Sequence, residues 1–108
     1  MEEIIQKYLQ KGEFREALKL LEIHKEKQSN NVALNYYFGK VYFQLNDHKK
    51  SLFYFRKCNQ INPRNPKILY NLAQVLQGQG KIDEAKKIYP DGWETIKPYL
   101  RKVPDPHK

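Results

Sequence analysis

The sequence has few of the features that mark secreted, membrane-spanning or disordered proteins. Its 108 residues include a single cysteine, Cys58, so no internal disulfide can form and an intracellular, cytoplasmic location is expected. No apolar run approaches the roughly 20 residues that span a bilayer, and the acidic, amphipathic N-terminus is unlike a secretory signal peptide. Only 5 glycines and 6 prolines accompany 40% apolar residues, which favours one ordered, helical domain over residues 1–108.

Residue patterns for catalysis or cofactor binding are also missing. His24, His48 and His107 have no partners at spacings typical of a zinc site or of a nucleophile–base pair. The Gly-Gln-Gly segment at 78–80 lies in a predicted helix–helix turn rather than after a strand, so it is not a phosphate-binding loop. We therefore expect no enzymatic activity, no metal site and no cofactor, and we interpret Cys58 as an inert, buried thiol.

Acidic residues are scarce outside the first quarter of the chain, and the net charge of +8 is therefore uneven. Residues 1–29 carry six basic and six acidic side chains, whereas 30–63 carry five against one and 64–108 carry nine against five. The basic excess can attract an acidic partner or nucleic acid. A solvated, lysine-rich surface is the favoured explanation, because the charges lie among helix-forming patterns.

What the sequence does contain is a repeat of 34 residues. Gly12, Asn46 and Gly80 are separated by this step (46 − 12 and 80 − 46). A fixed period near 34, with two apolar helical patterns and a turn in each unit, is typical of stacked helix–turn–helix repeats. The same step links three further sets, which are Ala17, Ser51 and Ala85, then Tyr8, Tyr42 and Leu76, then Phe14, His48 and Ile82.

Apolar periodicity predicts six helices, over residues 2–10, 13–26, 32–44, 49–59, 67–77 and from 82 until Pro90 ends the sixth. Gly39 lies in the middle of the third, where a small residue indicates that another helix crosses closely. Of Phe53 and Tyr54, at least one is expected near the surface or between repeats, and an exposed pair would indicate a protein contact. A short C-terminal cap is expected over 91–103, followed by a frayed tail over 104–108. The predicted inward-facing residues are Ile4, Ile5, Tyr8, Leu9, Phe14, Ala17, Leu18, Leu21, Leu34, Phe38, Val41, Tyr42, Leu45, Leu52, Phe55, Cys58, Ile68, Leu69, Leu72, Ala73, Leu76, Ala85 and Ile88.

This spacing, over about residues 2–89, resembles the tetratricopeptide repeat (TPR) family. The resemblance implies an all-α fold of three antiparallel helix–turn–helix repeats, 1–29, 30–63 and 64–90, stacked as a right-handed superhelix. The first repeat is the loosest, with Ile5 in a small-residue column and His24 departing from the pattern. The residues that carry the resemblance are Phe38-Gly39 with Tyr42, Leu72-Ala73 with Leu76, Ser51, Phe55, Cys58 and Pro63, then Ala85 and Tyr89, and in the first repeat Ala17 and Leu21.

In TPR proteins the first helices of successive repeats line a concave groove that takes peptides or helices. The resemblance therefore implies a protein–protein interaction adaptor, with Tyr36 and Tyr70 in one groove column. Tyrosines suit a peptide anchor, although they can also simply pack within the groove wall. The expected groove residues are Gln6, Tyr36, Tyr37, Lys40, Phe43, Lys67, Tyr70, Asn71, Gln74 and Gln77.

The carboxylate clamp by which some TPR co-chaperones hold heat-shock protein tails is expected to be absent. At its positions stand Glu2, Gln6, Tyr37, Lys67 and Asn71, and of these only Lys67 matches the family.

Two alternatives to groove binding stay open. One is nucleic-acid binding through a convex basic face, which we rank below protein binding because no aromatic stacking platform accompanies the lysines. The other is self-association, or docking in a larger assembly, through an uncapped N-terminal edge. The residues of the convex basic face are Lys49, Lys50, Arg56, Lys57, Lys86 and Lys87.

Overall fold

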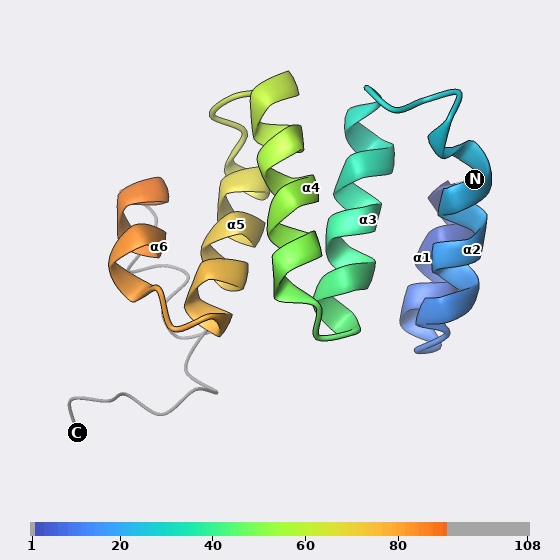
Figure 1. Ribbon diagram of the computed structural model, residues 1–108, viewed down its shortest axis with the longest axis horizontal. Coiled ribbons are helices and arrows are strands. Elements are labelled where there is room, and N and C mark those ends of the chain that lie inside the picture. Colours follow the sequence, from blue (N-terminus) through green and yellow to red (C-terminus); the bar gives the residue numbers. More distant parts are fainter. Residues whose placement is uncertain (1, 91–108) are drawn as a thin grey trace.

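The computed structural model describes residues 2–90, which form six helices in a row and no strand (Figure 1). This confirms the predicted all-α helical-repeat fold, and the helix bounds lie within two residues of those expected. The predicted cap over 91–103 and the tail over 104–108 lie outside the described residues. The helices are α1 (Glu2–Gln10), α2 (Phe14–Lys25), α3 (Val32–Gln44), α4 (His48–Ile61), α5 (Pro66–Gly78) and α6 (Ile82–Ile88).

The turns after α1, α3 and α5 share one backbone geometry. Gly12, Asn46 and Gly80 have φ angles of 74°, 66° and 80°, in the left-handed region. Glycine enters this region without steric cost, and asparagine tolerates it better than most residues. Each turn closes as a Schellman motif, which ends the helix and satisfies its free carbonyls. The closing bonds are Glu13 N–H to Tyr8 O, Asp47 N–H to Tyr42 O and Lys81 N–H to Leu76 O, each 2.8 Å long.

Two asparagines 34 residues apart begin α3 and α5, the helices that carry most of the predicted groove. The Asn31 Oδ1 accepts from the N–H of Leu34 at 3.0 Å, and the Asn65 Oδ1 accepts from the N–H groups of Lys67 and Ile68 at 3.0 and 3.3 Å. Each such cap stabilises a helix by about 1 kcal/mol. The starting points of both helices are therefore fixed by the same local chemistry.

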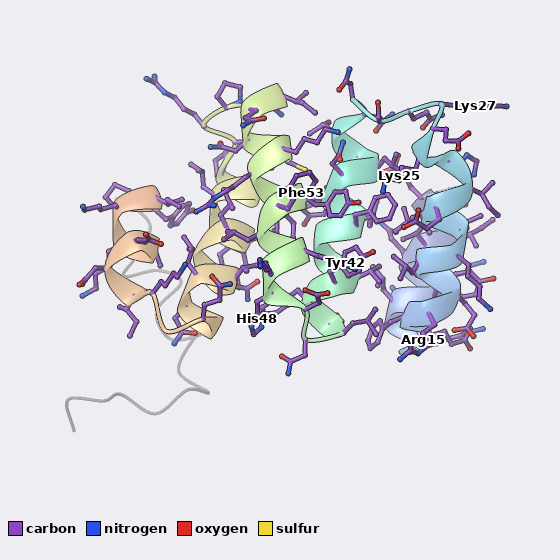
Figure 2. The ribbon with its side chains drawn as sticks, in the orientation of Figure 1. Arg15, Lys25, Lys27, Tyr42, His48 and Phe53 are labelled. Carbon is purple, nitrogen blue, oxygen red and sulfur yellow. The ribbon has the colours of Figure 1, made fainter. Side chains whose placement is uncertain are left out.

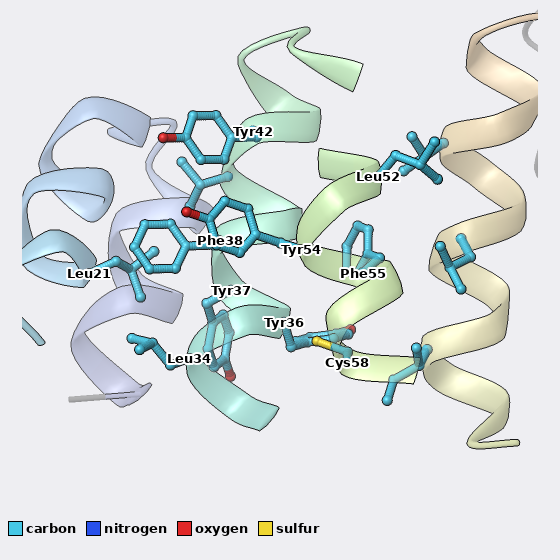
Figure 3. Packing of buried hydrophobic residues seen from close by; sticks show 14 of the residues in the cluster. Leu21, Leu34, Tyr36, Tyr37, Phe38, Tyr42, Leu52, Tyr54, Phe55 and Cys58 are labelled. Carbon is cyan, nitrogen blue, oxygen red and sulfur yellow. The ribbon is translucent and has the colours of Figure 1, made fainter. Parts of the chain in front are cut away.

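Gly39 lies where α3 and α4 come closest. A Cβ placed on it would be 2.7 Å from the ring of Phe55, which is fully buried. The hydroxyl of Ser51 donates to the carbonyl of Gly39 across 2.7 Å at the same crossing. The prediction of a close helix crossing at this glycine is confirmed. Figure 3 labels Phe55 among the side chains of the core.

The buried core follows the predicted stripes, with one correction. Ile4 is 49% exposed, whereas Ile5 is fully buried. The prediction for Ile4 is wrong because α1 packs on α2 by one face only, and adjacent residues point about 100° apart on a helix. Tyr54 is buried and Phe53 is 61% exposed, which confirms that one of this pair reaches the surface.

Candidate functional site

A groove of about 390 Å³ lies between α3 and α5, with Phe55 of α4 at its floor. Seven of the ten predicted groove residues line it, and they come from two successive repeats. Gln44 also lines it, one helical turn after Lys40, and the i, i+4 spacing is the signal that could have identified it. The seven are Tyr36, Lys40, Phe43, Lys67, Tyr70, Asn71 and Gln74.

The two tyrosines of the predicted anchor column differ in burial. Tyr36 is 9% exposed, and its ring lies edge-on to those of Tyr37 and Phe55 at centroid distances of 5.6 and 5.8 Å. Burial raises the pKa of the Tyr36 hydroxyl. Tyr70 is half-buried, and its hydroxyl accepts from the Gln74 amide at 3.1 Å. Tyr36 therefore packs within the groove wall, the alternative that the sequence left open, while Tyr70 presents part of its ring.

Two lysines converge on the ring of Tyr36, one from each side of the groove. The Lys67 Nζ lies 4.9 Å from the ring centroid and the Lys40 Nζ lies 5.6 Å from it, both within cation–π range. Burial, and then the positive charge of Lys67, lower the pKa of Lys40. No carboxylate lines the groove among the described residues. An anion between the two ammonium groups would relieve this repulsion.

The amide of Asn71 is largely committed to the protein itself. Its Nδ2 donates to the hydroxyl of Tyr36 at 3.2 Å and to the carbonyl of Lys67 at 2.7 Å. Both amide hydrogens are therefore used, and only the Oδ1 atom is free of these two bonds. Asn71 thus presents an acceptor rather than a donor to the groove, whose strongest donors are the ammonium groups of Lys40 and Lys67.

Three predicted groove residues do not line this groove. Gln6 donates to the hydroxyl of Tyr37 at 2.9 Å, and this bond ties α1 to α3. Tyr37 is buried, so it serves the packing between the first and second repeats. Gln77 is half-buried near the end of α5. The sequence prediction placed these three in the groove from their column position alone. Column position does not show which neighbouring side chains cover a residue.

The predicted convex basic residues separate into two groups. Lys49, Arg56 and Lys57 line a second depression, of about 710 Å³, on the exposed side of α4. Lys50 instead places its Nζ 5.3 Å from the ring centroid of Tyr42. Lys86 and Lys87 are exposed on α6 and do not line the depression. The described residues that complete its lining are Leu52, Phe53, Gln60, Gln79 and Lys81. Figure 2 labels Phe53 on α4.

Cys58 has the inert environment that the sequence predicts. Its side chain is fully buried, its Sγ donates to the carbonyl of Val32 at 3.5 Å, and burial raises the pKa of the thiol to about 12. Within residues 2–90, no cluster of three or more His, Cys, Asp or Glu side chains is arranged to hold a metal ion. No helix in this part of the chain is long and apolar enough to cross a membrane.

The repeated helix pairs, the shared turns and the groove between α3 and α5 define a protein of the TPR class. The chain belongs to the family described as anaphase-promoting complex, cyclosome, subunit 3, whose model matches residues 10–91. The TPR resemblance of the sequence is thereby confirmed.

Curated relatives extend this assignment. The chain is 27% identical over 88 residues to DnaJ homolog subfamily C member 3 of Mus musculus and 26% identical to that of Homo sapiens. Each alignment covers 82% of this chain but 18% of the relative. It is also 28% identical over 105 residues to the Photosystem I assembly protein Ycf3 of Rippkaea orientalis, covering 87% of this chain and 60% of that protein. The family supports a general role in protein interaction or assembly.

Proposed function

We propose that the protein is an interaction module that binds an extended, acidic segment of another protein in the groove between α3 and α5. The observation that carries this proposal is the convergence of Lys40 and Lys67 over the ring of Tyr36, without a carboxylate among the described lining residues. The two ammonium groups form a site that an aspartate or glutamate side chain neutralises.

The rest of the groove suits a peptide. Tyr70 and Phe43 are half-buried and offer apolar surface beside the two lysines. The side-chain oxygens of Asn71 and Gln74 can accept hydrogen bonds from the main-chain N–H groups of an extended segment. The proposal is for a binding module, not an enzyme, and assembly roles named among its relatives and family support it.

The test compares partner capture by the full-length protein and by a Lys40→Gln/Lys67→Gln variant. A Lys7→Gln/Lys19→Gln variant is the matched control, because these two lysines are exposed on α1 and α2, away from the groove. Partners captured from extract are identified, and their segments are then titrated as purified peptides. We expect the groove variant to bind about tenfold more weakly, and the control to bind as the wild type. Equal affinity of the two variants would contradict the proposal.

A further inference from the structure

We propose that the depression on the exposed side of α4, hereafter the α4 depression, is a second docking site. It takes an acidic protein segment that carries one large apolar side chain. The α4 depression shares no lining residue with the groove between α3 and α5. This inference is therefore independent of the proposed function, and either site can be lost without the other.

The centre of the α4 depression is an exposed aromatic ring on a rigid base. Phe53 is 61% exposed, and no other aromatic side chain among residues 2–90 is as open to solvent. Its ring stands edge-on to the buried ring of Tyr54 at 5.1 Å, and Tyr54 is itself stacked on Phe38 at 4.6 Å. Phe53 therefore has one ring contact with the buried aromatic stack, and most of its surface is open to solvent. An exposed, preorganised ring beside a concavity is typical of a protein contact.

Cations surround that ring in a regular pattern. Lys49 stands four residues before Phe53, and Arg56 and Lys57 stand three and four residues after it, so all lie one helical turn away on the same face. Lys81 adds a fourth cation from the turn before α6. The pattern fits a segment whose apolar side chain is flanked by carboxylates.

No acidic side chain lines the α4 depression among the described residues, and Asp83 and Glu84 in the first turn of α6 are the carboxylates nearest to Lys81 in the sequence. The sequence has no aspartate or glutamate from His48 to Ile82, which covers α4, α5 and the turn that follows. The carboxylate just before this stretch, that of Asp47, accepts from the N–H of Lys50 as the cap of α4. Charge complementarity therefore selects an acidic occupant.

A neutral group at the edge of the α4 depression adds a hydrogen-bonding site. The Oε1 atom of Gln79 is buried and has no hydrogen-bond partner among the described residues. Buried polar atoms without a partner are rare, because each loses its hydration without compensation. A side-chain rotation towards a docked segment would let a main-chain N–H supply the missing donor.

A protein segment fits these features better than a nucleic acid does. Single-stranded nucleic acids are held by several exposed aromatic rings that stack on successive bases. Among the described residues Phe53 is the one such ring that lines the α4 depression, and the neighbouring rings of Tyr54 and Tyr42 are buried in the core stack. One apolar centre with a cationic border instead matches one anchoring side chain with acidic neighbours.

The test uses the full-length protein and a fluorescent peptide in which one phenylalanine is flanked on both sides by three glutamates. Two matched peptides replace the phenylalanine by serine or the glutamates by glutamines. Anisotropy titrations compare the wild type with Phe53→Ser and Arg56→Glu/Lys57→Glu variants. Ile23→Ser is the control, because Ile23 is 72% exposed on α2 and also stands between two lysines, Lys19 and Lys27.

We expect the peptide to bind the wild type and the Ile23→Ser variant equally. Either α4 variant, or either altered peptide, should bind at least about tenfold more weakly. Backbone amide shifts induced by the peptide should cluster over residues 49–60. The Lys40→Gln/Lys67→Gln variant should bind as the wild type, which separates this site from the groove.

Several results would overturn the inference. One is that the wild type does not bind the peptide even at millimolar concentration. Another is that the α4 variants bind it as tightly as the wild type does, and a third is that the amide shifts are confined to the groove. A single-stranded oligonucleotide that binds more tightly than the peptide would assign the surface to nucleic acid. Sedimentation showing a dimer that Arg56→Glu/Lys57→Glu dissociates would assign it to a second copy of this chain. Amide shifts in residues 91–108 when the peptide binds the wild type would assign the α4 depression to the chain's own C-terminal segment.

Discussion

The side-chain amide of Asn71 donates a hydrogen bond to the hydroxyl of Tyr36 across 3.2 Å, and so joins α5 to α3 at the wall of the groove. This bond links two successive repeats through side chains that stand 35 residues apart. It also separates the roles of two tyrosines in one column. Tyr36 packs at the repeat interface, while Tyr70 is half-buried and is the tyrosine that we propose to contact a bound segment.

The Tyr36–Asn71 bond predicts unequal effects of removing the two hydroxyls. Tyr36→Phe leaves a buried amide hydrogen without its acceptor, and should lower the free energy of unfolding by about 1–2 kcal/mol. Tyr70→Phe removes a part-buried bond to Gln74 and should cost less than about 0.5 kcal/mol. Urea unfolding followed by circular dichroism measures both. Equal losses would show that the two tyrosines have the same structural role.

The Gly39–Phe55 contact predicts that alanine is harmful in the middle of α3. Helix propensity alone favours Gly39→Ala by about 1 kcal/mol. The added Cβ would lie 2.7 Å from a ring that the core holds in place, so the net effect should be a loss of about 1–3 kcal/mol. Thermal unfolding tests this, with Phe55→Leu and the double variant completing a mutant cycle. We expect the double variant to lose less stability than the sum of the two single losses. A Gly39→Ala variant that melts at a higher temperature than the wild type would contradict the importance of this contact.

Because the Cys58 thiol is buried, the free energy of unfolding should fall in alkaline solution. The unfolded thiol ionises near 9.0, whereas burial raises the pKa in the folded protein to about 12. Between these values the folded state holds more protons, so this contribution is intact below pH 9 and is lost as the pH rises towards 12. A Cys58→Ala variant should lack this part of the pH dependence. With a thiol reagent at pH 8, the wild type should react only as it unfolds, and rapid labelling in the native state would contradict the buried environment.

The contribution of Lys40 to the free energy of unfolding should change with pH in the opposite direction. Its pKa in the folded protein lies below the ordinary 10.5, first through burial and then through Lys67. Between the lowered value and 10.5 the unfolded state holds more protons, so this group's contribution to stability rises with pH. An NMR titration of the Lys40 side chain should show its midpoint move towards 10.5 in a Lys67→Gln variant. A bound acidic peptide should also raise the midpoint. No change in either case would count against the proposal that Lys40 and Lys67 together hold a carboxylate.

The local features of the repeat could be predicted from the sequence because single residues determine them. Glycine or asparagine at a fixed place in each unit sets a left-handed turn, and Gly39 reports the helix crossing. The difference between Tyr36 and Tyr70 could not be predicted in this way. Their 34-residue separation places both in one column, but burial depends on what Asn71 and Phe55 cover.

The groove and the convex basic residues also show what the repeat pattern can and cannot predict. The sequence predicted most of the groove, since columns of α3 and α5 recur with the repeat. It grouped six convex cations as one face, yet Lys50 turns towards Tyr42 while Lys49, Arg56 and Lys57 share a depression with Phe53. Periodicity indicates which way a side chain leaves the helix. It does not indicate which neighbour the end of a long, flexible side chain meets.

The matching asparagine caps of α3 and α5 make the second repeat a cassette whose two ends are chemically alike. Residues 31–64 begin at one asparagine cap and stop just before the next, at Asn65. A second copy of that cassette inserted after residue 64 would inherit its turn, its cap and its crossing without any new junction chemistry. The groove would then gain another lysine and tyrosine in register with the first pair. The proposed groove would therefore lengthen by one whole cassette at a time, and the partner segment that it holds would lengthen in the same steps.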